Sequence, residues 1–311
     1  MDFMIKLLRY NPHTDNAHIP KNMIWIIGNF DGVHLGHQSV IQLAHHNNPH
    51  HTPIGLLTFE PHPRRIFKPD SPTFRIMSFG QKLQILNQYG VNYCYAYKFS
   101  KDLAEMSGDA FCQKILSQHL SASKIIVGYD FCFGKNRSGT TDSLIKSGEQ
   151  YGFETIIAPP AVHHHTRYSS SKLREYITSG NMDMVKEFLG RDYILSGHVS
   201  QGRQMARTIG YPTANIYLKN ILLPAFGVYA GRVSDNAGQT YSAIANIGVK
   251  PTVSQDNIPI LEIHIPNFTG DLYGQKLHFA FDKRIRPEQK FVSLDDLRIQ
   301  ITQDIAMMKR I

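Results

Sequence analysis

The sequence predicts two domains: an α/β domain built on a parallel sheet, then an antiparallel β-barrel with a terminal helix. Short apolar runs alternate with helical patterns in the first half, which is typical of a parallel sheet with helices on both faces. Strands dominate from residue 193 onward, with Gly, Pro and Asn between them, which predicts an antiparallel barrel or sandwich. The 311 residues also exceed the ~250 at which single cores stop growing.

In the first half, the expected strands lie near residues 23–28, 54–59, 93–98, 124–129 and 153–158. A helix is expected over residues 78–89, because Ser78 with Gln81 forms a capping box and Gly90 follows as a stop signal. Another helix is expected from about residue 108 to 120.

Two short helices follow, near residues 170–179 and 182–189, and each ends at a glycine. The boundary is therefore placed after Gly190, which gives domains of residues 1–190 and 191–311. The strands expected in the second domain lie near residues 193–200, 214–218, 227–234, 240–247, 260–265 and 276–282. A capped amphipathic helix near residues 293–308 closes the chain.

Composition narrows the class of protein. The chain is 42% hydrophobic and 19% charged, which is typical of a packed globular protein. No apolar run approaches the ~20 residues that span a bilayer, and the N-terminus lacks signal-peptide zones, so we expect a cytoplasmic protein without a membrane partner. A formal charge of +8 indicates an anionic partner, either nucleic acid or a polyphosphate.

Residues 28–37 follow the first expected strand and open a helix, which is where α/β sheets bind ligands. His34 and His37 are three residues apart, so they share a face in the first turn of a helix. Together with the free main-chain amides of that turn, they can hold an oxyanion. Gly36 between them would let a nucleotide lie close to the backbone. The simpler alternative is that two polar residues begin a surface helix.

A second motif lies at the expected helix start of residues 169–174. The hydroxyls of Ser170 and Ser171, the amides and the two cations, Lys172 and Arg174, could clamp a pyrophosphate as charge builds on it. An ordinary helix cap is the alternative. In combination with the histidine motif, this segment indicates adenylyl transfer.

In the second half, residues 210–215 lead into a strand. Thr213 and Asn215 are two residues apart and face the same way, so their side-chain oxygens can meet one ion. Hard oxygen ligands suit Mg²⁺ carried by ATP. Ordinary polar residues on a wet strand face are the alternative.

These motifs and their neighbours resemble known families over nearly the whole chain. The first half resembles the nucleotidyltransferase superfamily, and more closely its bacterial FMN adenylyltransferase branch, in residues 28–37, 58–63, 128–134 and 169–174. The second half resembles riboflavin kinases in residues 210–215, 226–229, 246–252, 261–264 and 273–274.

The resemblance implies a Rossmann-like nucleotidyltransferase domain and a riboflavin kinase barrel, as in the bacterial bifunctional riboflavin kinase/FMN adenylyltransferase (FAD synthetase) family. Such a chain would phosphorylate riboflavin to FMN with ATP and then adenylylate FMN with ATP to FAD and pyrophosphate. Its partners would be riboflavin, FMN, FAD and ATP, with Mg²⁺ accompanying ATP.

The resemblance also implies roles for individual residues. The residues with implied catalytic roles are Glu262, His34, His37 and Arg174. ATP and its phosphates would be bound by Gly28, Asn29, Phe30, Asp31, Gly36, Ser170, Ser171, Thr213 and Asn215. The flavin would be bound by Phe59, Pro61, His62, Asp130, Phe131 and Arg286. Thr213 and Asn215 would hold the metal, and Glu262, which alternates with apolar neighbours, would be the general base.

Two departures from the family pattern leave alternatives open. Cys132 stands where arginine is usual, and Ala206 stands where the kinases have a glycine in the loop that covers the phosphates. A chain with only the adenylyltransferase activity and a flavin-sensing barrel is therefore the second hypothesis. A nucleic-acid binder is a third, but the sequence has no Lys/Arg-rich run with interleaved aromatic residues. The sequence does not indicate an oligomeric state.

Overall fold

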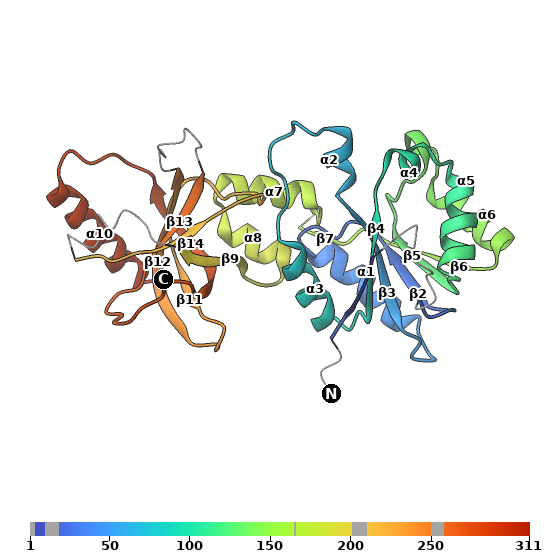
Figure 1. The fold of residues 1–311 in the computed structure, drawn as a ribbon, viewed down its shortest axis with the longest axis horizontal. Coiled ribbons are helices and arrows are strands. Elements are labelled where there is room, and N and C mark those ends of the chain that lie inside the picture. The colour runs from blue at the N-terminus through green and yellow to red at the C-terminus, as the bar shows by residue number, and fades with distance from the viewer. Residues whose placement is uncertain (1–3, 10–18, 165, 201–209, 250–257) are drawn as a thin grey trace. The chain divides into compact units, whose positions relative to one another are not determined.

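The computed structural model describes residues 4–9, 19–164, 166–200, 210–249 and 258–311 (Figure 1). The chain forms two compact units, which we call the first and second unit. The first consists of Met1–Pro72 and Ser78–Ser169, and the second of Thr73–Met77 and Ser170–Ile311. Helices α7 (Ser170–Ser179) and α8 (Met182–Leu189) thus lie in the second unit. The division of function at residue 190 stays a prediction.

The first unit is built on a parallel sheet, which confirms the prediction. Its strands are β1 (Lys6–Arg9), β2 (Ile24–Ile27), β3 (Ile54–Glu60), β4 (Tyr93–Lys98), β5 (Lys124–Gly128) and β6 (Glu154–Ala158). They lie in the order β1-β4-β3-β2-β5-β6, so the chain changes direction across the sheet between β2 and β5. Ligands of such sheets bind outside the carboxyl ends of the strands at this switch point.

Helices lie on both faces of this sheet (Figure 1). They are α1 (Leu35–His46), α2 (Pro63–Phe67), α3 (Phe79–Gln88), α4 (Lys101–Glu105), α5 (Gly108–Phe111), the π-helical η1 (Cys112–His119), the 3₁₀ turn η2 (Lys135–Arg137) and α6 (Thr141–Tyr151). The capping box of Ser78 and Gln81 at α3 is present as predicted. A short hairpin of β7 (Val162–His163) and β8 (Thr166–Arg167) precedes α7.

The core of the first unit is centred on Trp25 of β2, which is fully buried. Its ring centroid lies 6.3 Å from that of Tyr95 on β4. Gly55 of β3 faces the indole, and a side chain there would overlap the Trp25 ring. The absence of a Cβ at Gly55 therefore lets the largest core side chain pack flat against the sheet.

The second unit contains a closed antiparallel barrel, as predicted. Its strands are β9 (Tyr193–Ser200), β10 (Ala214–Tyr217), β11 (Gly227–Ser234), β12 (Thr240–Val249), β13 (Pro259–His264) and β14 (Lys276–Pro287), in the order β10-β13-β12-β11-β14-β9. Helix α10 (Leu294–Met308) packs on β11, β12 and β14, and the Ser293 hydroxyl caps its start. Among the described residues, no helix has both the length and the apolar sequence that a membrane span requires.

Candidate functional sites

The loop after β2 has a left-handed backbone at two residues that carry side chains. Phe30 has a φ of 49° and Val33 a φ of 40°. Such a conformation is rare for a β-branched residue, costs on the order of 1–3 kcal/mol, and occurs mostly at functional sites. The loop ends at the amino terminus of α1, whose first turn contains no acidic residue. This helix end favours an anion.

Three aromatic rings form a stack along this loop. The centroids of the His34 and His37 rings are 3.7 Å apart, and those of His37 and Phe30 are 4.4 Å apart. His34 is only 4% exposed. The three-residue spacing therefore does bring the two histidines to one face, as the sequence predicts. The ring of Phe30 stacks on that of His37.

Gly36 is enclosed on the side where a side chain would project. A Cβ there would lie 3.1 Å from the His34 ring and 3.2 Å from the Cβ of Tyr168. Both distances are shorter than ordinary van der Waals contacts. Gly36 thus lets His34 and Tyr168 pack against the helix start, and the close approach of a nucleotide at this glycine stays a prediction.

Asn29 has an unsatisfied polar atom at this edge of the sheet. Its side-chain oxygen is buried and has no hydrogen-bond partner among the described residues. A buried acceptor without a partner costs about 1–3 kcal/mol. A ligand that offers a donor or a cation would recover that cost.

The other predicted segments of the first unit lie at the same edge, because β3, β2 and β5 are adjacent and parallel. In the loop after β5, Asp130 is exposed, and the ring of Phe131 stacks on that of Phe133 at 5.4 Å. Gly134 follows with a φ of 71°, and a Cβ there would overlap the backbone of Gly108. This glycine is required by its conformation and by the close approach.

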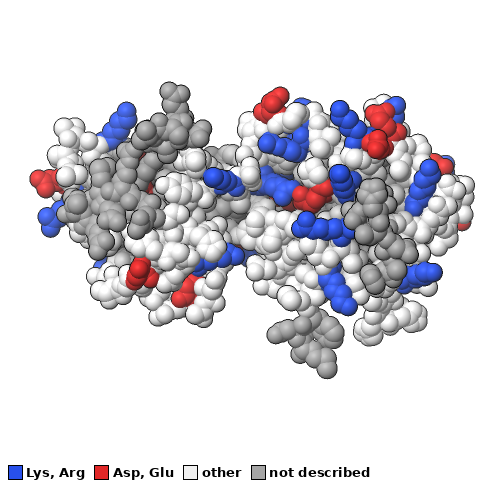
Figure 2. Space-filling view, in the orientation of Figure 1, with Lys and Arg blue, Asp and Glu red and all other residues white. Residues whose placement is uncertain are grey.

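At the end of β3, Phe59 contacts Phe99 edge-on at 5.8 Å, so part of its ring belongs to the core. Pro61 follows in the same segment, and the His62 ring accepts a hydrogen bond from the Arg64 amide at 3.1 Å. His62 therefore caps the short helix α2. Figure 2 shows Lys and Arg side chains over the part of the first unit where α2 and α3 lie, with Asp and Glu side chains among them.

Ser170, Ser171 and Arg174 lie in α7, in the second unit. The Arg174 Nε donates to the main-chain oxygen of Phe74 at 2.8 Å, and its guanidinium carbon lies 5.6 Å from the Phe74 ring centroid. These contacts hold the Arg174 guanidinium against Phe74. That Arg174 acts together with His34 stays a proposal.

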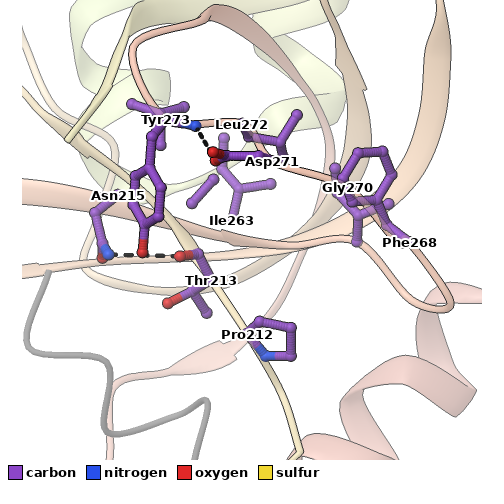
Figure 3. Close-up of a pocket in the computed structure, with 12 residues that line it drawn as sticks. Pro212, Thr213, Asn215, Ile263, Phe268, Gly270, Asp271, Leu272 and Tyr273 are labelled. Carbon is purple, nitrogen blue, oxygen red and sulfur yellow. Dashed lines mark hydrogen bonds between the residues drawn. The ribbon is translucent and has the colours of Figure 1, made fainter. Parts of the chain in front are cut away.

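The second unit contains a cavity of about 390 Å³ at the start of β10 (Figure 3). Thr213 and Asn215 line it from one side, and Asp271 and Tyr273 line it from the facing loop. Asn215 is 4% exposed, and its side-chain oxygen has no hydrogen-bond partner among the described residues. The apolar wall is formed by Val199, Ile263, Ile265, Phe268 and Leu272.

Glu262 of β13 lies next to this cavity but is not part of its lining. Glu262 is half-buried, whereas Leu261 and Ile263 beside it are almost fully buried. This difference agrees with the prediction that Glu262 points away from the apolar face of the strand. Strand pairing places Asn215 directly opposite it on one side and Asn246 on the other. Asn246 was not predicted as a site residue, because cross-strand pairing is not visible in local sequence patterns.

His264, two residues further along β13, supports the segment that leads to Thr213. Its Nδ1 donates to the main-chain oxygen of Pro212 at 2.9 Å, and its ring contacts Tyr211. Burial lowers the pKa of His264 below its ordinary value. The neutral imidazole therefore serves as a fixed hydrogen-bond donor at the edge of the cavity.

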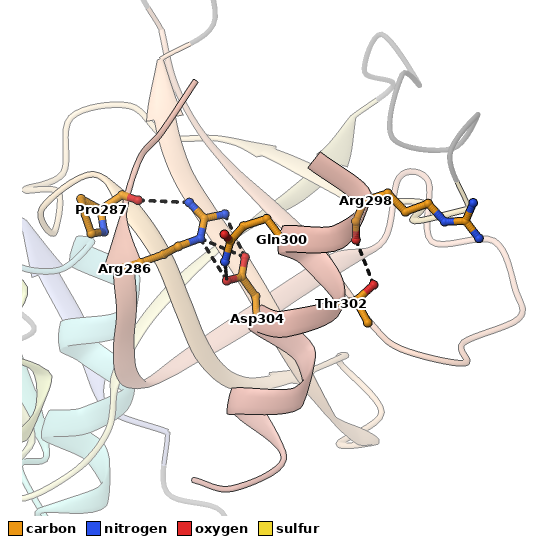
Figure 4. Close-up of polar contacts among 6 residues, drawn as sticks. All are labelled: Arg286, Pro287, Arg298, Gln300, Thr302 and Asp304. Atoms are coloured by element: carbon orange, nitrogen blue, oxygen red, sulfur yellow. Dashed lines mark hydrogen bonds and ion pairs between the residues drawn. The ribbon is translucent and has the colours of Figure 1, made fainter. Parts of the chain in front are cut away.

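Arg286 of β14 forms a bidentate ion pair with Asp304 of α10 (Figure 4). The two shortest contacts are 3.0 Å from Nε and 2.8 Å from Nη2, and Gln300 donates to the same carboxylate at 3.0 Å. Asp304 is 1% exposed. The guanidinium thus fastens α10 to the barrel, while its predicted contact with flavin stays untested.

The departure at Ala206 and the family block at residues 250–252 lie outside the described residues. Cys132 lies in the loop after β5, where it is half-buried.

Comparisons with known proteins cover both units. Residues 16–172 match the FAD synthetase family model, and residues 189–311 match the riboflavin kinase family model. The bifunctional riboflavin kinase/FMN adenylyltransferase of Escherichia coli (strain K12) is 36% identical over 96% of both chains. The enzyme of that description from Haemophilus influenzae is 35% identical over 91% of this chain and 92% of its own.

Among solved structures, this chain is similar to one described as a macrolide-efflux protein from Streptococcus pneumoniae. The TM-score is 0.87 at 29% sequence identity, and the match covers 98% of this chain and 99% of that one. The two domain matches, the near-complete coverage of the relatives and the observed fold agree with one another. The chain belongs to the bifunctional riboflavin kinase/FMN adenylyltransferase family.

Proposed function

We propose that the two activities of this family are divided between the two ends of the chain, with the kinase in the barrel. The protein phosphorylates riboflavin to FMN with ATP, and it adenylylates FMN with a second ATP to give FAD and pyrophosphate. Flavins are therefore its substrates and its products. The observation that carries the kinase assignment is the buried Asn215 oxygen, which has no hydrogen-bond partner in the part of the chain that the structure describes and lies beside Thr213 in a cavity next to Glu262.

In the kinase step, the Glu262 carboxylate would accept the proton of the riboflavin 5′-hydroxyl as that oxygen attacks the γ-phosphorus of ATP. A positioned base of this kind contributes roughly 10²–10⁴-fold to a rate. The apolar wall of the cavity suits an adenine ring, since ligand pockets combine apolar walls with few polar groups.

Thr213 and Asn215 would hold Mg²⁺ in this site. Both offer the hard oxygen ligands that Mg²⁺ prefers, and the Asn215 oxygen has no other partner among the described residues. When bound with ATP, the ion neutralises charge that builds on the phosphates.

In the adenylyl-transfer step, the FMN phosphate would attack the α-phosphorus of ATP, and pyrophosphate would leave. His34, His37 and Arg174 would neutralise the leaving group, with Ser170 and Ser171 donating to it. Gly28, Asn29, Phe30, Asp31 and Gly36 would form the rest of the ATP site. The phosphate is already ionised at neutral pH, so this step requires no general base.

Flavin contacts in the first unit would come from Phe59 at the carboxyl end of β3 and from Pro61, His62, Asp130 and Phe131 in the segments that follow β3 and β5. Arg286 would add a contact in the kinase unit. We infer further that the protein works in the cytoplasm without nucleic-acid or membrane partners, which stays a prediction.

The test is to incubate the purified protein with ATP, Mg²⁺ and either riboflavin or FMN, and to separate the flavins by chromatography. FAD is expected from both substrates. Glu262→Gln should block only the riboflavin route, and His37→Ala should stop the reaction at FMN. FAD from FMN alone would instead support the second hypothesis, in which the barrel is a flavin sensor.

A further inference from the structure

Lys82 is a buried lysine of the first unit that lies outside the family motifs. It is near the start of α3, and its side chain is only 8% exposed. Lysine is almost never fully buried unless its charge is paired. The groups around its ammonium therefore indicate what the charge does.

The Lys82 ammonium joins the carboxyl ends of β2 and β3. Its Nζ donates to the main-chain oxygen of Asn29 at 3.1 Å and to the Thr58 hydroxyl at 3.3 Å. The Thr58 hydroxyl itself donates to the same Asn29 oxygen at 3.4 Å. The Glu60 carboxylate is farther away, at 3.9 Å, and the Phe79 ring centroid lies 5.0 Å from Nζ.

This contact acts at the start of a loop whose backbone is strained. Asn29 begins the loop whose next residues include the left-handed Phe30 and Val33. Such a conformation persists only where surrounding contacts over-determine it. A charge-assisted hydrogen bond is stronger than a neutral one, so the ammonium is well suited to fix the start of the loop.

Filling the space between α3 and the sheet would not by itself require a charge here. Removing an ammonium from water is costly, and an apolar residue of similar volume often stabilises a protein more. At the carboxyl end of this sheet, where we propose that ATP binds, a buried cation can act on the charge of the nucleotide. In a low-dielectric site, a fixed charge strengthens the stabilisation of negative charge that develops on the departing phosphates.

We propose that Lys82 is a positioning residue for adenylyl transfer, which fixes the Asn29 loop and places a positive charge behind the nucleotide site. This inference rests on the function proposed for the first unit. Lys82 acts through Asn29 and through its field, without contact to the reacting atoms.

The matched control is Lys124, which begins β5 at the opposite edge of the same sheet. Its Nζ donates to the main-chain oxygen of Asn47 at 2.9 Å and pairs with Glu154 at 3.1 Å. Its side chain is 17% exposed. Lys124→Met thus removes a comparable lysine that also bonds a carbonyl, far from the nucleotide loop.

The experiment measures FMN adenylylation by the full-length protein and its Lys82→Met, Lys82→Arg and Lys124→Met variants over a range of ATP concentrations. The loss of one charge-assisted hydrogen bond predicts that Lys82→Met lowers kcat/KM for ATP on the order of tenfold to a hundredfold. Lys124→Met should stay within about twofold of wild type. Lys82→Arg should recover a large part of the loss, and riboflavin phosphorylation should be the same in all four proteins.

The outcomes separate this inference from the proposed function. If the wild type forms no FAD from FMN, the proposed function is wrong. If the wild type is active but Lys82→Met loses no more than Lys124→Met, or Lys82→Arg is no better than Lys82→Met, only the role of Lys82 is overturned. If circular dichroism shows that Lys82→Met does not fold, Lys82→Gln replaces it, and a wild-type kcat/KM in that variant overturns the inference.

Discussion

Asn215 of β10 lies directly opposite Glu262 of β13 in the barrel. Directly opposed residues of an antiparallel pair project to the same face, so the amide and the carboxylate are neighbours there. Asn246 of β12 takes the corresponding place on the other side of Glu262. The carboxylate is thus flanked by two amides, while its sequence neighbours are buried in the barrel core.

The first prediction concerns the proposed base of the kinase. Glu262→Gln keeps the size of the side chain but cannot accept a proton. We expect riboflavin phosphorylation to fall by roughly 10²–10⁴-fold, while FMN adenylylation in the same preparation is unchanged. Initial rates with each flavin substrate measure both activities. Equal losses in the two would show that the substitution damages the fold.

A second prediction separates function from stability at Asn215. Asn215→Leu removes a buried oxygen that has no hydrogen-bond partner among the described residues, together with an amide nitrogen that makes a long hydrogen bond of 3.5 Å to the Thr213 main-chain oxygen. Replacing such a group by an apolar one should leave thermal stability without ligands unchanged, or raise it by about 1 kcal/mol. Kinase activity should fall at least about tenfold, because one oxygen ligand is lost. A variant with full activity over a range of Mg²⁺ concentrations would contradict the assignment of Asn215 as a metal ligand.

Removal of the His37 side chain should affect only the adenylylation of FMN. His37→Ala deletes the central ring of the stack with His34 and Phe30. We expect riboflavin to be converted to FMN at the wild-type rate and FAD formation to drop on the order of 10²-fold or more. Chromatography of the products over time shows whether FMN accumulates. FAD formation at the wild-type rate would remove His37 from the site.

The local elements and the strand pairings differ in how well the sequence predicts them. The capping box of Ser78 and Gln81 is encoded within four residues, and the helix begins there as predicted. Helix α6 has the same kind of start, a capping box of Thr140 and Ser143, and it ends at Gly152. It was not predicted, although these signals are also local. Strand β1 was also not predicted, because its four residues carry little periodicity.

The residues beside the candidate sites that the sequence does not predict all depend on contacts between distant segments. Lys82 meets Asn29 from 53 positions away, and Asn246 meets Glu262 only through the pairing of β12 with β13. Arg286 was predicted as a flavin contact from the family resemblance, and its carboxylate partner lies 18 residues later on α10. Motifs identify residue types and local spacing, but long-range pairing decides which side chains meet.

The ion pair between Arg286 and Asp304 should be important for the stability of the barrel. Asp304→Leu leaves the guanidinium, which is 15% exposed at the side-chain level, without its carboxylate. Breaking a buried pair in this way costs about 3–5 kcal/mol, whereas the double variant Arg286→Met/Asp304→Leu should regain most of it. Urea denaturation of the three proteins measures the difference. A double variant as unstable as the single one would mean that α10 needs the charges themselves.

The last prediction concerns acid stability of the barrel. Burial lowers the pKa values of His264 and His278, because it disfavours the charged imidazolium. The unfolded chain therefore binds more protons than the folded one below the ordinary pKa of about 6.5. Stability is fully present above that pH and decreases as the pH falls toward the folded values.

For each of the two groups, the slope of this loss cannot exceed about 1.4 kcal/mol per pH unit. His264→Asn keeps an amide donor for Pro212 but cannot titrate, so its denaturation midpoint should depend less on pH between about 5 and 7.5 than that of the wild type. His198→Asn changes an exposed histidine of β9 and serves as the control. Equal pH slopes in the wild type and His264→Asn would mean that His264 is protonated alike in the folded and unfolded states, and that its bond to Pro212 does not depend on a neutral ring.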